Sequence, residues 1–114
     1  MALDIEARRC FSRISLRAPL RYQVRGKPEA YNAVCDNISK GGLCFNCDKF
    51  ITPLSTLMLE INLLSRVLKP IGKVAWAQDI SRSYTKRIGV EFVEFDPSEK
   101  NFLGDFIDLQ TNNL

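Results

Sequence analysis

Apolar and polar residues alternate along most of this chain, in short stretches separated by turn residues. The clearest stretch covers 14–25 and has apolar positions at Ile14, Leu16, Ala18, Leu20, Tyr22 and Val24. A period of two predicts a half-buried β-strand, and Pro19 marks an edge or a bulge because proline cannot donate to a strand ladder. Further strands are expected at about 30–36, 43–47, 57–63, 67–78 and 86–95. Trp76 shares the inward side of its strand, which favours a core position over a stacking platform.

The period changes near the end of the chain. One helical face there carries four apolar residues, Phe102, Leu103, Phe106 and Ile107. Before them, Asp96 suits the N-cap, Pro97 the first helical position, and Glu99 completes a spacing like that of a capping box. We therefore expect a helix over about 97–110. Six short strands and one terminal helix favour a mainly β fold, a small closed or nearly closed antiparallel barrel, because closure removes exposed strand edges.

The length of 114 residues fits one domain with a small core. We divide it into a flexible arginine-rich leader over 1–13 and a barrel domain with its helix over 14–114. The longest apolar stretches fall far below the ~20 residues of a membrane span. The first residues have no apolar run after their charges, so no secretory signal is expected. A cytoplasmic protein without a membrane span is the resulting prediction.

The chain has four cysteines, Cys10, Cys35, Cys44 and Cys47, and no histidine. Cys44 and Cys47 form a single CxxC inside an expected strand. A zinc site would need both other cysteines as well, so buried free thiols are favoured over a metal or redox site. The absence of histidine removes the usual general base, which argues against an enzyme.

Positive charge is concentrated at the front of the chain. Residues 1–28 hold seven bases and two acids, which gives +5, and residues 29–114 hold nine bases and eleven acids, which gives −2. Within the first part, Arg8, Arg9 and Arg13 fall within six residues. Guanidinium groups match phosphate oxygens and stack on bases, so this cluster predicts a compact anionic ligand. The alternative is a solubilising leader that pairs with Asp4 and Glu6.

A second candidate element is the segment 37–42, read as a turn between two strands, with Asp36 beside it. The segment contains Asn37, Ser39, Gly41 and Gly42. Asn and Asp side chains can read a guanine edge, Ser39 can hold the turn or contact phosphate, and glycines allow positive φ and a close ligand approach. An ordinary loop is the alternative. In a hairpin, the start of the first strand lies beside the end of the second, so both elements converge at one end of the sheet.

These residues resemble the motifs of a known family. The spacing from Arg9 to Arg13, preceded by Arg8, resembles the RxxxR signature of PilZ domains, and 37–45 resembles their [D/N]xSxxG turn and following strand. The segments 72–76 and 87–92 resemble later strands of the family. The resemblance covers nearly the whole chain in the right order.

The resemblance implies a bacterial, six-stranded, split-barrel-like PilZ β-barrel with a C-terminal helix that binds cyclic di-GMP, often as an intercalated dimer. Arg9 and Arg13 would grip phosphates and stack on guanine. Asn37 and Ser39 would line the guanine site, and Gly42 would allow the close turn. No cofactor besides this ligand is implied. A downstream protein of motility, adhesion or polysaccharide machinery would be the partner of a monomer or weak dimer.

Two other functions stay open. An adaptor of the same fold could bind proteins without nucleotide, although the intact arginines and Asn37 argue against it. A small barrel could also bind single-stranded nucleic acid, but that function requires a basic groove with several exposed aromatics. Most aromatics here alternate inward, so DNA is not an expected partner.

Overall fold

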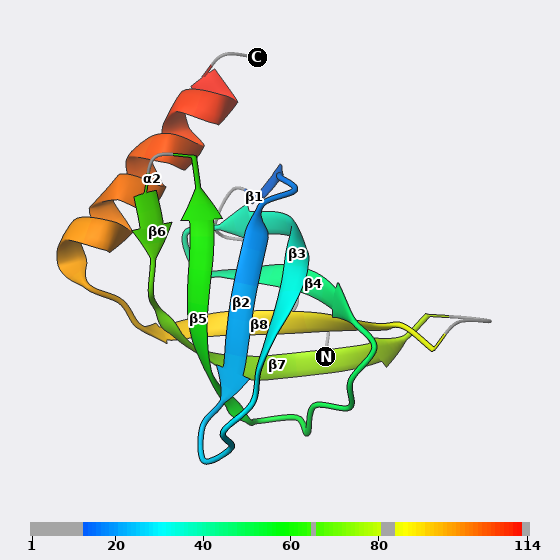
Figure 1. Ribbon diagram of the computed structural model, residues 1–114. Helices are drawn as coiled ribbons and strands as arrows, with labels where there is room; N and C mark the ends of the chain where they lie inside the picture. The colour runs from blue at the N-terminus through cyan, green and yellow to red at the C-terminus, as the bar shows by residue number, and fades with distance from the viewer. Residues whose placement is uncertain (1–12, 65, 81–83, 113–114) are drawn as a thin grey trace.

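The computed structural model of the protein describes residues 13–64, 66–80 and 84–112 (Figure 1). Its strands are β1 (Arg13–Ser15), β2 (Pro19–Val24), β3 (Ala30–Ser39), β4 (Gly42–Cys47), β5 (Thr56–Leu63), β6 (Arg66–Leu68), β7 (Ile71–Asp79) and β8 (Lys86–Glu94). Helix α2 (Pro97–Asn112) follows them.

Six of these strands close a barrel. They pair antiparallel in the order β2, β5, β7, β8, β4 and β3, and β3 pairs again with β2. The two short strands extend this ring, since β1 pairs with the end of β3 and β6 pairs with β5. The predicted class, a six-stranded antiparallel barrel with a C-terminal helix, is confirmed.

Two strands predicted as continuous are interrupted. The stretch 14–25 divides into β1 and β2, which pair with opposite ends of β3. The amide of Leu16 donates to Asp36 and the carbonyl of Ala18 accepts from Cys35 across the gap. The stretch 67–78 divides into β6 and β7 before and after Pro70. Proline cannot donate to a ladder, and its carbonyl instead accepts from the Leu59 amide at 3.1 Å.

The turn predicted at 37–42 is shorter than expected. Strand β3 continues through Asn37 and Ser39, and only Lys40 and Gly41 separate it from β4. The extension is stable because this end of β3 has a partner on both sides, β1 on one and β4 on the other. Long-range pairing thus outweighs the turn preference of the local sequence.

Helix α2 closes one flank of the barrel and lies beside β6 (Figure 1). Leu103 and Ile107 are fully buried in the core, as the helical period predicts. The Asp96 carboxylate accepts from the amides of Ser98 at 2.9 Å and Glu99 at 3.3 Å, so the predicted N-cap is confirmed. Glu99 instead bonds the Lys69 amide at 2.8 Å, which ties the helix start to the segment after β6. Within the ranges described, no helix has the length and apolar character needed to cross a membrane.

Candidate functional site

Arg13 and Asn37 lie side by side although 24 positions separate them in the chain. Strand β1 runs along the end of β3, and Arg13 Nη1 donates to Asn37 Oδ1 at 3.1 Å. The same nitrogen lies 3.7 Å from Cys44 Sγ on β4. The hairpin geometry therefore brings one of the predicted arginines to the second predicted element. Arg8 and Arg9 lie outside the described residues.

Ser39 has a structural position in the turn. Its side chain is only 3% exposed, and its hydroxyl oxygen accepts from the amides of Gly41 and Gly42, each at 3.2 Å. The hydroxyl also lies 3.3 Å from the Gly42 carbonyl, to which it donates. Of the two roles considered for Ser39, holding the turn matches this geometry.

Gly41 and Gly42 were expected to allow positive φ and a close approach of the ligand, and the structure gives a different reason for Gly42. Among the described residues, positive φ occurs at Gly26, Leu54 and Leu64, so neither Gly41 nor Gly42 needs it. At Gly42, a side chain would collide with the backbone carbonyl of Val90 on β8. Gly42 is thus needed for close approach of two strands.

Asp36 lies at a β-bulge of β3 and pairs with Arg87 of β8 at 3.1 Å. This ion pair joins β3 to β8 across the end of β4. Asp36 is not among the pocket-lining residues described next. Asn37, its neighbour in β3, is not among them either, and Asn37 is connected to the pocket through its hydrogen bond with the lining residue Arg13.

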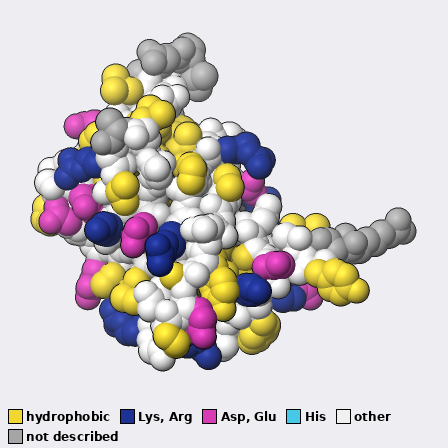
Figure 2. Space-filling model, viewed as in Figure 1, with side chains coloured by type: hydrophobic (Ala, Val, Ile, Leu, Met, Phe, Trp, Pro, Cys, Tyr) yellow, Lys and Arg dark blue, Asp and Glu magenta, His cyan; other side chains and the backbone are white. Residues whose placement is uncertain are grey.

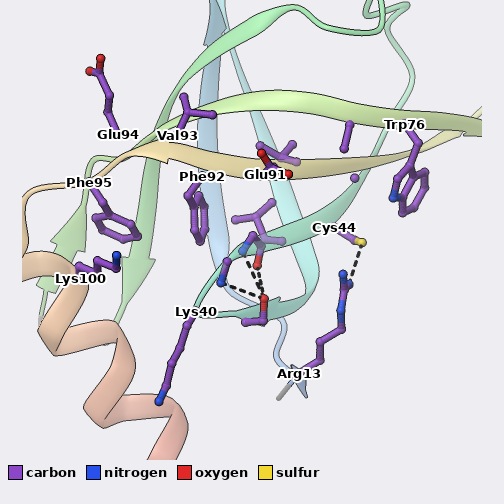
Figure 3. A pocket seen from close by; sticks show the side chains of 17 residues that line it. Arg13, Lys40, Cys44, Trp76, Glu91, Phe92, Val93, Glu94, Phe95 and Lys100 are labelled. Carbon is purple, nitrogen blue, oxygen red and sulfur yellow. Dashed lines mark hydrogen bonds between the residues drawn. The ribbon is translucent and has the colours of Figure 1, made fainter. Parts of the chain in front are cut away.

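A pocket of about 740 Å³ opens beside Arg13 and the 39–42 turn (Figure 3). Besides Arg13, Ser39, Gly41 and Gly42, its lining includes residues that the sequence did not single out as binding residues, namely Lys40, Cys44, Gly89, Glu91, Phe92, Phe95 and Lys100, together with Trp76. Arg13 and Trp76 lie at one end of this pocket, and Phe95 and Lys100 lie at the other (Figure 3). The pocket thus combines cationic groups with aromatic rings.

Trp76 is a pocket residue, so the prediction of a core position is wrong. A bulge between Val74 and Trp76 shifts the alternation of β7 by one residue, which moves Trp76 off the inward side. Its indole packs against Gly89 of β8, where any Cβ would collide with the ring. In the sequence, the feature that makes room for this ring is Gly89 in the next strand. It can be recognised only once the pairing of β7 with β8 is known.

Lys40 connects the turn to helix α2. Its ammonium lies 3.0 Å from the Asp108 carboxylate, and its stem passes 3.7 Å from the position of a Cβ on Gly104. The helix therefore fixes one wall of the pocket. On the face that Figure 2 shows, other basic side chains alternate with acidic ones and form no stripe.

Cys35 and Cys47 belong to the hydrophobic core, whereas Cys44 is buried but lines the pocket beside Arg13. Cys35, Cys44 and Cys47 are buried free thiols, and burial raises the pKa of the Cys35 thiol. In the described part of the chain, no cluster of three or more potential metal ligands occurs. Cys10 lies outside that part.

Comparisons with known proteins identify a matching family and similar folds. A family model described as PilZ domain matches residues 7–109. No curated protein matches. Among solved structures, the inhibitor of motility MotI/DgrA of Bacillus subtilis has a TM-score of 0.79 at 19% identity, covering 90% of this chain and 51% of that one. YcgR from Escherichia coli in complex with c-di-GMP has a TM-score of 0.77 at 16% identity, covering 93% and 47%.

The isolated PilZ domain of YcgR from Escherichia coli, solved with c-di-GMP, has a TM-score of 0.72 at 15% identity and covers 93% of both chains. The chain therefore spans about half the length of MotI/DgrA and of whole YcgR. At these identities, the likeness to solved structures shows a shared fold.

Proposed function

This chain belongs to the PilZ domain family, and from that premise we propose that it is a non-catalytic receptor for cyclic di-GMP. The structural neighbours solved with c-di-GMP support this ligand. The observation that carries the proposal is that Arg13 and Trp76 line one pocket, and that Arg13 donates a hydrogen bond to Asn37.

The chemistry of these groups suits a guanine nucleotide. A guanidinium on the pocket rim can bind a phosphate bidentately or stack on a base. An amide whose oxygen accepts from Arg13 still offers its NH₂ group to the acceptors N7 and O6 of guanine. The Trp76 ring adds a flat apolar surface for a base.

We assign the remaining predicted residues to the same site in three roles. Arg8 and Arg9 would bind phosphates together with Arg13. Ser39, Gly41 and Gly42 would shape the turn beneath the ligand, in line with the hydrogen bonds of Ser39. Asp36 would act indirectly, since its ion pair with Arg87 fixes the bulge next to Asn37.

The signalling step would be an ordering of the leader. Three clustered guanidinium groups repel one another, and the ligand's phosphates screen that repulsion. The leader over 1–13 would then wrap the ligand on the barrel over 14–114, and the newly ordered surface would bind a downstream protein in the cytoplasm.

Calorimetric titration with cyclic di-GMP tests the proposal, with GTP and cyclic AMP as ligand controls. Arg13→Ala should weaken binding by about 1.5–3 kcal/mol, the scale of a hydrogen bond to a charged group. Arg25→Ala is the matched control because Arg25 is an exposed arginine that does not line the pocket. Absence of both heat and thermal shift at high ligand concentration would reject the receptor and favour the nucleotide-independent adaptor.

A further inference from the structure

Two carboxylates, Glu91 and Glu94, line a pocket that is otherwise suited to an anionic ligand. Figure 3 places Glu91 between Trp76 and Phe92, and Glu94 at the far end of the pocket from Arg13. A carboxylate repels phosphate, so the central position of Glu91 needs a chemical reason other than phosphate binding.

The strand register fixes that position. On β8, Ile88 and Val90 are buried, so Gly89 and Glu91 face outward. The Trp76 ring covers Gly89, and Glu91 stands two residues further along the same face, ~6.5 Å away. Opposite Glu91 on β4 is Gly42, which has no side chain to cover it. A planar group resting beside Trp76 therefore presents its edge to the Glu91 carboxylate.

An ionised carboxylate only accepts hydrogen bonds, so its partner in the ligand must donate. Guanine has two neighbouring donors on its Watson–Crick edge, N1–H and the 2-amino group, whereas adenine has an acceptor at N1. Lys73 of β7 lies opposite Glu91 in the strand register, but the ion pairs in the part of the chain that the structure describes are Lys40–Asp108, Lys86–Asp79 and Arg87–Asp36, so Glu91 forms no ion pair there.

We propose that Glu91 determines base specificity by accepting hydrogen bonds from N1–H and the 2-amino group of one guanine. This inference rests on the proposed function, because it names a contact within the same site. This role explains why a carboxylate lies in the middle of a nucleotide pocket. It assigns discrimination between guanine and other bases to a residue of β8 rather than to the arginines.

The experiment compares cyclic di-GMP with its inosine analogue, cyclic di-IMP, which lacks only the 2-amino groups. Calorimetry on the full chain should show the guanine ligand binding about tenfold or more tightly, because a carboxylate loses a charge-assisted hydrogen bond with inosine. Glu91→Ala should weaken cyclic di-GMP binding and bring the ratio of the two dissociation constants close to one. Glu60→Ala, which removes the same charge from an exposed residue of β5 that does not line the pocket, should keep the wild-type ratio.

The possible outcomes separate this inference from the receptor proposal. An unchanged ratio in Glu91→Ala, or equal affinity of the wild type for both ligands, would overturn the role of Glu91 while the receptor stands. A parallel gain of affinity for both ligands in Glu91→Ala would mean that Glu91 only repels phosphate, and would also overturn it. No binding of either ligand by the wild type would overturn both proposals.

Discussion

At the scale of single residues, two glycines determine how closely the strands of the pocket approach. A side chain at Gly42 would collide with the Val90 carbonyl, and one at Gly89 would collide with the Trp76 ring. The sequence points to Gly42 through its place in a turn motif, but its actual neighbour is a strand 48 positions away in the chain. The sequence thus identifies Gly42 as a residue that must be glycine, but the physical reason, its contact with Val90, depends on the pairing of β4 with β8.

Replacement of Gly42 by alanine should lower the free energy of unfolding by about 1–3 kcal/mol, the usual cost of overpacking. Gly104→Ala is the matched control. Gly104 lies inside helix α2, and its nearest atom would be Lys40 Cε at an ordinary 3.7 Å. That change should be neutral or stabilise by up to about 1 kcal/mol, since alanine favours helices over glycine. Urea unfolding of both variants measures the difference, and equal effects would contradict the close approach at Gly42.

At the scale of elements, the sequence predicts where strands exist better than which face each residue occupies. Alternation locates every strand of the ring, and Asp96 with Pro97 locates the helix start. A β-bulge adds one residue and reverses the alternation after it, without a marker in the local sequence. The bulge before Trp76 is the reason that this ring was predicted in the core and lies in the pocket instead.

The cap of α2 should make part of the stability depend on pH. Hydrogen bonds from the Ser98 hydroxyl, and then from the amides of Glu99 and Ser98, lower the pKa of Asp96. A lowered folded-state pKa stabilises the fold above the ordinary aspartate value of about 3.9, and that contribution disappears as the pH falls through the folded-state pKa. Asp96→Asn keeps a capping side chain that does not titrate.

The Tm of wild type minus that of Asp96→Asn should therefore be largest near neutral pH and shrink between about pH 5 and pH 3. Circular dichroism melts across this range provide the measurement, and Asp105→Asn, a change of an exposed acid beyond the first turn, controls for net charge. A Tm difference independent of pH would show that the Asp96 charge does not contribute to the cap.

At the scale of the whole molecule, barrel closure determines which parts of the site the sequence could predict. The position of Arg13 beside the turn can be predicted from strands that are close in the sequence, because the end of β3 returns alongside β1. Trp76, Glu91 and Phe92 come instead from β7 and β8, which reach the turn only because β8 pairs with β4 to close the ring. Such long-range pairing has no local signature, so half of the pocket could not be predicted.

Closure also separates folding from ligand binding along the chain. All six strands of the ring begin at Pro19 or later, so a chain that starts at Ser12 should fold and keep its Tm without ligand. That chain lacks Arg8 and Arg9, so its affinity for cyclic di-GMP should fall at least tenfold. At a ligand concentration one hundred times the wild-type Kd, the full chain should gain about 2.7 kcal/mol, roughly 10 °C in Tm, and the shortened chain about half of that or less. A ligand-free Tm well below that of the full chain would mean that the leader belongs to the fold. An equal Tm shift in both chains would mean that residues from 12 onward are sufficient for binding.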